Sequence, residues 1–128
     1  MIERWEFTRS SIPYIKKAYN HMYMSRSTLF AYIGKVDDPD ILVIIADFLT
    51  HTGGIYTVVI GGVYEGSLSI VFRSDGIRRS AGKLATNAFG KYGSAGGHKT
   101  AARAEIPIEN LKKEEISINE KAIEDFIL

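Results

Sequence analysis

The stretch Gly93–Arg103 reads GSAGGHKTAAR and places two adjacent glycines, Gly96 and Gly97, directly before His98 and Lys99. Glycine tolerates backbone conformations that other residues avoid, so its N–H groups can turn toward a ligand. A titratable imidazole and a cation follow at once. This pattern is typical of a loop that binds an anion, and an ordinary glycine-rich turn with a surface histidine and lysine fits the spacing equally well.

Positive charge is concentrated around this stretch. Residues 73–103 contain seven lysines and arginines against one acid, Asp75, which gives a net charge of +6. The other residues hold nine basic and fourteen acidic side chains, a net charge of −5, and the whole chain carries +1. One basic region in an otherwise acidic chain favours a local site for phosphate or a nucleic-acid end over a surface that covers many phosphates of a duplex.

Length and composition bound the remaining possibilities. The chain has 128 residues, 45% of them hydrophobic and 11% aromatic, which fits one globular domain with a core. It contains no cysteine, so neither a disulfide framework nor a thiolate metal site can form. No apolar run is long enough to span a membrane and the first residues lack the pattern of a secretory signal, so we expect a cytoplasmic protein.

Apolar periodicity and capping residues predict two helices and a strand in the first half of the chain. Ser11 caps an amphipathic helix that runs to about Ser25, and Leu29–Val36 alternates as a strand. A second helix is capped by Asp37 or Asp38, has Pro39 in its first turn, and ends at two glycines. It is expected to pack on a sheet through the apolar residues Ile41, Ile44, Ile45, Phe48 and Leu49, with Asp47 on its narrow polar side.

The second half of the chain predicts three more strands. Ile55–Val63 and the alternating residues up to Phe72 form a hairpin, so that Arg73 and Ser74 lie just past a strand end. Ser80 then caps a third helix that buries Ala81, Leu84, Ala85, Ala88 and Phe89. After the glycine stretch come a strand to Pro107, a charged connection over 110–115, and a last helix capped by Ser117 or Asn119. The order predicts a single α/β domain with a mixed sheet of about four to five strands flanked by helices.

These residues resemble a known family. The stretch Gly96–Ala102 (GGHKTAA), with Phe72, Arg73 and Ser74 at a strand end and the sequence ADFL at residues 46–49, is similar to the DHH-associated C-terminal domain of DHH phosphoesterases. That family includes RecJ-type exonucleases and oligoribonuclease/pAp-phosphatase proteins. The similarity covers roughly residues 29–107. It implies a lead-in helix over 1–26 from an upstream catalytic domain, the DHH-associated domain over 27–116, and a C-terminal helix over 117–128.

The resemblance implies a function for this domain. In the family it presents substrate to a catalytic domain that binds two manganese ions through Asp-His-His and Asp-x-Asp motifs. This chain has no Asp-His-His, and capping explains its one Asp-x-Asp, Asp38–Asp40, so we expect no metal or other cofactor and no catalytic residue here. The implied partners are a short oligonucleotide or nucleoside phosphate and the upstream catalytic domain, with oligomerisation possible and no membrane.

Candidate substrate-binding residues follow from the resemblance. Arg73 would hold a phosphate, and the two glycines with His98 would complete its site. The full candidate set is Arg73, Ser74, Gly96, Gly97, His98, Lys99 and Arg103. For Arg78, Arg79 and Lys83, which lie before or early in the third helix, a solvated face is the more frequent explanation.

One departure affects the expected loop. The family usually has three glycines before the histidine, and here the first of them is replaced by Ala95. If that position needs a positive φ, alanine costs roughly 1 kcal/mol.

Two other functions fit the residues. The chain could be a stand-alone module that binds nucleic acid or nucleotide, or an interaction or dimerisation domain whose basic segment is incidental. Phosphate-dependent stabilisation distinguishes the last from the others.

Overall fold

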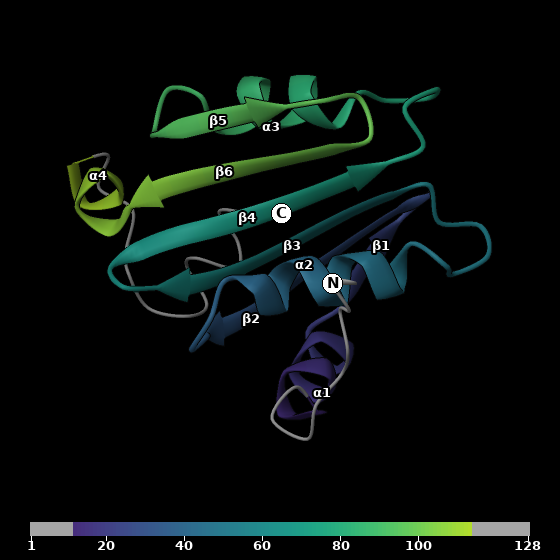
Figure 1. Ribbon diagram of the computed structural model, residues 1–128, viewed down its shortest axis with the longest axis horizontal. Coiled ribbons are helices and arrows are strands. Elements are labelled where there is room, and N and C mark those ends of the chain that lie inside the picture. The colour runs from purple at the N-terminus through teal and green to yellow at the C-terminus, as the bar shows by residue number, and fades with distance from the viewer. Residues whose placement is uncertain (1–11, 114–128) are drawn as a thin grey trace, which may run out of the picture.

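The computed structural model describes residues 12–113, which form one α/β domain built on a mixed sheet (Figure 1). Six strands lie in the order β1-β2-β3-β4-β6-β5 in this part of the chain. They are β1 (Tyr23–Ser25), β2 (Thr28–Lys35), β3 (Thr57–Tyr64), β4 (Ser67–Ser74), β5 (Ser94–Gly97) and β6 (Ala101–Pro107). The fold class is therefore as predicted, with one or two strands more than the sequence indicated.

The sheet is antiparallel except where β2 pairs with β3. The chain crosses between these two parallel strands through helix α2 (Asp40–Leu49), as a parallel pair requires. Strands β3 and β4 form the predicted hairpin, in which Tyr64 pairs with Ser67 across a two-residue turn. Glu65 and Gly66 have φ values of 45° and 77°, and positive φ at both turn positions matches the right-handed twist of the strands.

Helices cover both faces of the sheet. Helices α1 (Ile12–Asn20) and α2 pack on one face, and helix α3 (Ala81–Phe89) packs on the other, against β4, β5 and β6 (Figure 1). Side chains alternate between two cores accordingly, since successive residues of a strand point to opposite faces. Val71 belongs to the core under α2, and the next residue, Phe72, belongs to the core under α3.

Local sequence explains how α2 and α3 begin. Pro39 has helical dihedral angles (φ −64°, ψ −18°), and the Asp38 carboxylate accepts a hydrogen bond of 2.9 Å from the amide of Asp40. Ser80 has extended dihedral angles and its side chain accepts a hydrogen bond from the amide of Lys83, as the capping prediction requires. The Ser80 cap is therefore confirmed, whereas α2 begins one residue later than predicted, at Asp40, with Pro39 in place of an aspartate as its N-cap.

The first predicted helix is too long. Helix α1 ends at Asn20, and residues 23–25 form the edge strand β1, antiparallel to β2. The helix buries Ala18 against the core, while Ile12 and Tyr19 are 60% and 75% exposed. The sequence pattern merged the helix and β1 into one predicted helix, because Met22 follows at helical spacing. Over such a short segment, alternating and helical apolar patterns overlap.

The glycine stretch forms a β-hairpin with a short turn, and the described part of the charged connection is helical. Residues 94–97 form strand β5, paired with β6, and Ile108–Lys113 form the short helix α4. Two helix faces also differ from the prediction. Phe48 is 53% exposed because α2 buries Leu42, Ile45, Ala46 and Leu49 instead, and Ala88 of α3 is exposed. The predicted cap at Ser11 and the last predicted helix lie outside the described residues.

Candidate functional site

The predicted anion-binding loop is the turn of a β-hairpin. The amide of His98 donates a hydrogen bond of 2.8 Å to the carbonyl of Ala101, which closes the turn between β5 and β6. Ala95 does not have a positive φ. In the described part of the chain, the non-glycine residues with positive φ are Arg26 and Glu65. The missing third glycine therefore costs nothing here, since extended backbone accepts alanine.

The hairpin turn is docked on the N-terminus of α3. The amides of Ala81 and Gly82 donate hydrogen bonds of 2.8 Å each to the carbonyls of Lys99 and His98. The amide of Lys83 is capped by the Ser80 side chain. Since the protein already satisfies these three first-turn donors, the end of α3 is not itself the anion site. The docking fixes the main chain of His98 and Lys99 against the helix.

A groove runs between this turn and α3. It has a volume of about 490 Å³ and is lined by Ser80, Gly82, Lys83, Thr86, Asn87, Gly97, His98 and Lys99. His98, Lys99 and Lys83 are exposed, and among residues 12–113 no acidic side chain forms an ion pair with either lysine. Two cations and an imidazole thus border one shallow groove beside the Asn87 amide. Such a set of donors matches the oxygens of a phosphate group.

Lys83 and Asn87 also line this groove and lie outside the predicted set of substrate-binding residues. They stand four positions apart on α3 and so share one helix face, opposite the buried Ala81 and Ala85. That spacing was visible in the sequence. What could not be read from it is that the hairpin turn folds back onto the same helix face.

Arg73 does not reach this groove. It lies near the end of β4 on the face covered by α2, where its Nε donates a hydrogen bond of 2.8 Å to the Asp47 carboxylate. Its Nη1 donates a second hydrogen bond, of 2.9 Å, to the carbonyl of Phe72. The groove with His98 lies on the α3 side of the sheet. The structure thus places these two predicted ligands near the same end of the sheet, on opposite faces.

The other predicted residues are also divided. The Ser74 hydroxyl donates a hydrogen bond of 2.6 Å to the carbonyl of Arg79, so it anchors the loop that leads to α3. Gly96 and Arg103 are paired across β5 and β6 and line a shallow hollow with Glu105. Arg103 lies 3.8 Å from that carboxylate, a loose ion pair. Of the seven predicted residues, Gly97, His98 and Lys99 therefore share the groove.

Neither a metal cluster nor a membrane helix is found in residues 12–113. These residues contain no group of three or more histidine and acidic side chains that could hold an ion. None of their helices is long and apolar enough to cross a membrane.

Comparison with known proteins gives one relative in sequence. The chain is 33% identical over 109 residues to an uncharacterized protein of Methanocaldococcus jannaschii. The match covers 84% of this chain and 22% of the relative, so the chain spans about a fifth of that protein's length. No protein-family model matches the sequence.

Solved structures share the fold at low sequence identity. An exopolyphosphatase-related protein from Bacteroides fragilis has a TM-score of 0.62 at 14% identity, over 94% of this chain and 36% of that one. The pGpG-specific phosphodiesterase of Vibrio cholerae has a TM-score of 0.52 at 16% identity, over 91% and 38%. The C-Ala domain of Aquifex aeolicus alanyl-tRNA synthetase has a TM-score of 0.56 at 18% identity, over 83% and 96%. These similarities show a common fold.

Proposed function

We propose that this chain is the substrate-binding part of a DHH-type phosphoesterase and holds a phosphate group of a nucleotide or short nucleic acid in the groove between α3 and the β5–β6 turn. The observation that carries the proposal is the convergence of His98 and Lys99 with Lys83 and Asn87 on one groove. The net charge of +6 over residues 73–103 adds a local positive field.

The comparisons support this proposal at the level of fold. Two of the structures with this fold belong to a phosphodiesterase and to an exopolyphosphatase-related protein, and in each the similar region is little more than a third of the chain. A companion domain would supply the chemistry, including the manganese ions that the resemblance implies. The role of this chain's own residues is to bind and orient the phosphate.

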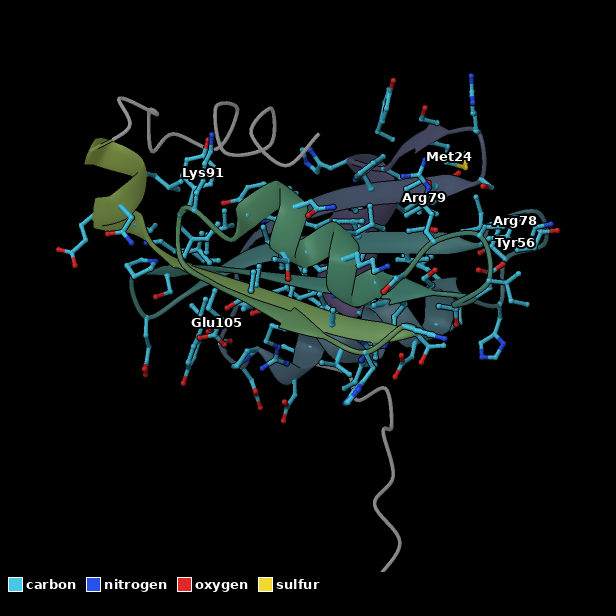
Figure 2. The ribbon with its side chains drawn as sticks, turned by 90° about the horizontal axis from the view of Figure 1, so that it is seen from above. Met24, Tyr56, Arg78, Arg79, Lys91 and Glu105 are labelled. Atoms are coloured by element: carbon cyan, nitrogen blue, oxygen red, sulfur yellow. The ribbon has the colours of Figure 1, made fainter. Side chains whose placement is uncertain are left out.

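Ligand-induced thermal stabilisation tests the proposal. Adenosine 3′,5′-bisphosphate and a dinucleotide should raise the melting temperature of the chain, because a ligand that binds the folded state stabilises it by mass action. The double variant His98→Ala/Lys99→Ala should lose this shift. Lys91→Ala is the matched control, since it removes a cation of the same basic segment at the other end of α3 (Figure 2). The Lys91 ammonium lies over the Tyr92 ring there.

Two outcomes would contradict the proposal. An unchanged melting temperature for wild type with every phosphate ligand would favour the interaction domain. A shift that survives in the double variant would place the site elsewhere, and Arg73→Ala, made in parallel, would show whether the role implied for Arg73 is real.

A second candidate, a stand-alone binding module, has one observation in its favour. The similarity covers 96% of the solved chain of the C-Ala domain, which is itself one domain of alanyl-tRNA synthetase, so this fold can form without the rest of its parent protein. Affinity decides between the two. A stand-alone module should bind a short oligonucleotide tightly in isothermal titration calorimetry, whereas a substrate-binding half should bind weakly without its companion domain.

A further inference from the structure

Helix α3 leaves part of its sheet face uncovered. It packs on β4, β5 and β6, and beside it, toward β1, β2 and β3, lies a second cavity of about 660 Å³. The walls of this cavity include the apolar side chains Phe30, Val59, Phe72, Leu84 and Phe89. Phe30 is half-buried, so one aromatic side chain of the wall remains accessible. A planar apolar ligand fits such a surface.

Three arginines border this apolar floor. Arg26 comes from the turn between β1 and β2, and Arg78 and Arg79 come from the loop before α3. Figure 2 shows Arg78 and Arg79 at the same end of the molecule as Tyr56 and Met24, with Lys91 at the opposite end. The hydroxyl-bearing residues Ser25, Ser27, Thr28 and Thr57 also line the cavity. It therefore combines an aromatic surface, hydroxyl groups and three cations.

Arg78 is held in place, and Arg79 is available. The Arg78 guanidinium donates a hydrogen bond of 2.9 Å to Asp75 and lies 3.8 Å from the centre of the Tyr56 ring. The Ser74 hydroxyl fixes the main chain of Arg79. No carboxylate within residues 12–113 pairs with the guanidinium of Arg79 or with that of Arg26. These two arginines are free to bind an anion.

The turn between β1 and β2 presents Arg26 to the cavity. Ser25 pairs with Thr28 across a two-residue turn whose first residue is Arg26. Its φ is 57°, as such turns favour, although the left-handed region suits glycine, asparagine and aspartate better than arginine. The turn therefore places Arg26 on the rim of the cavity.

We propose that this cavity binds a nucleotide unit, with the base over Phe30 and the phosphate between Arg79 and Arg26. The ligand class follows from the combination, because an aromatic floor alone would suit any apolar ligand and three arginines alone would suit any anion. The inference rests on the proposed function and extends it: Lys83 and Asn87 line the groove and Leu84 and Ala88 line the cavity, so the two sites lie on adjacent faces of α3. They would receive neighbouring nucleotides of one short chain.

Chemical-shift mapping with adenosine 5′-monophosphate separates the two sites. In the wild-type chain the nucleotide should shift amide signals of Thr28 and Thr57 and methyl signals of Val59 and Leu84. Signals of Asn87 and Lys99 report on the groove. If the groove signals move and those of the cavity do not, the inference is overturned while the proposed function stands. If only the cavity signals move, the phosphate site in the groove is wrong, and the cavity alone binds the nucleotide.

Three variants test the assigned roles by titration. Arg79→Ala should weaken the binding of adenosine 5′-monophosphate about tenfold, and Lys91→Ala should leave it unchanged. Phe30→Leu should weaken the nucleotide about fivefold and leave ribose 5-phosphate unaffected, since the sugar phosphate has no base to stack. Equal losses for both probes would remove the stacking role.

The variant Arg26→Gly separates an effect on nucleotide binding from an effect on folding. Glycine relieves the positive φ, so the variant should melt at the same temperature as wild type or higher and yet bind the nucleotide several-fold more weakly. A variant that folds as well as wild type and binds equally would remove Arg26 from the site. Binding of octanoate more tightly than adenosine 5′-monophosphate would overturn the nucleotide assignment altogether.

Discussion

At the residue scale, the ion pair between Arg73 and Asp47 joins β4 to α2. The Arg73 side chain is 19% exposed and that of Asp47 is 49% exposed, so solvent screens the pair in part. We expect Asp47→Asn to lower the free energy of unfolding by about 0.5–1 kcal/mol, measured by urea denaturation. Glu105→Gln is the control: its carboxylate lies 3.8 Å from Arg103, too far for a good hydrogen bond, and its loss should cost less. An equal cost for both variants would contradict this ranking.

The Asp75 carboxylate organises the loop that carries Arg78 and Arg79. The backbone amide of Arg78 donates to it at 3.0 Å, and this contact, with smaller contributions from the Ile77 amide and the Arg78 side chain, holds the pKa of Asp75 below its usual value against partial desolvation. A lowered folded pKa stabilises the protein at pH values above the ordinary aspartate pKa, about 3.9, and this contribution is lost as the pH falls through the folded pKa.

The causes of this shift lead to a prediction for one variant. Because the largest contribution comes from a main-chain amide, Arg78→Ala should leave the pKa of Asp75 below normal, though higher than in wild type. Carboxyl chemical shifts followed from pH 2 to pH 6 measure it. A normal Asp75 pKa in Arg78→Ala would mean that the loop depends on the arginine side chain, which would also change how Arg79 is presented to the cavity.

At the element scale, α3 and β5 touch through two glycines. A Cβ added to Gly97 would lie 2.6 Å from both the carbonyl oxygen of Ala101 and the Cα of Ala102, and its φ is 151°. A Cβ on Gly82 would lie 2.7 Å from the carbonyl oxygen of Gly97. Gly96, one residue earlier, has nothing within 4 Å of that position and no positive φ. The two neighbouring glycines are therefore not equivalent.

Alanine substitutions should separate these two glycines. Gly97→Ala should lower the free energy of unfolding by roughly 1–3 kcal/mol, because backbone atoms must move, and should also weaken phosphate binding in the groove by moving the turn. Gly96→Ala should change neither quantity noticeably. Urea denaturation and phosphate titration of both variants measure this. Equal effects would show that the close approach of Gly97 to Ala101 and Ala102 does not constrain the hairpin.

The elements that sequence predicts well are those with local signals. The Ser80 cap and the Glu65–Gly66 turn depend on neighbouring residues, and both are found; α2 begins at Asp40, one residue after the predicted start at Pro39. The orientation of α2 is not local: all its residues except Asp40 and Asp47 are apolar, so the pattern could not decide which stripe faces the sheet. Strand β5 contains only serine, alanine and glycine, which have low β-propensity. It is a strand because it pairs with β6, and the local sequence does not predict it.

At the scale of the whole molecule, the sequence predicted which types of residue form the candidate site. It did not predict which of these residues lie together in the fold. The basic segment and the pair His98–Lys99 stand out in the sequence. Of the segment's cations, Arg78 and Arg79 border the cavity and Lys83 and Lys99 border the groove. Which side of the sheet each cation occupies depends on strand register. Adjacent residues of β4 face opposite sides, so Arg73 points to α2 because Phe72 points to α3. A resemblance in sequence carries residue types, and the tertiary pairing of strands decides which of them meet.

Charge distribution over the whole molecule predicts how binding depends on salt. With the positive charge gathered on one segment and a net charge of only +1, the molecule can contact few phosphates at once. For a single-stranded ligand that displaces counterions from two or three phosphates, log K should fall with log salt concentration with a slope of roughly −1.5 to −2. Fluorescence anisotropy of a labelled trinucleotide measures the slope over a roughly tenfold range of salt concentration, from 25 to 300 mM.

The double variant His98→Ala/Lys99→Ala should flatten the slope, because it removes a lysine that faces phosphate. A much steeper wild-type slope would instead indicate a surface that follows a long duplex, and would contradict a site that contacts two or three phosphates.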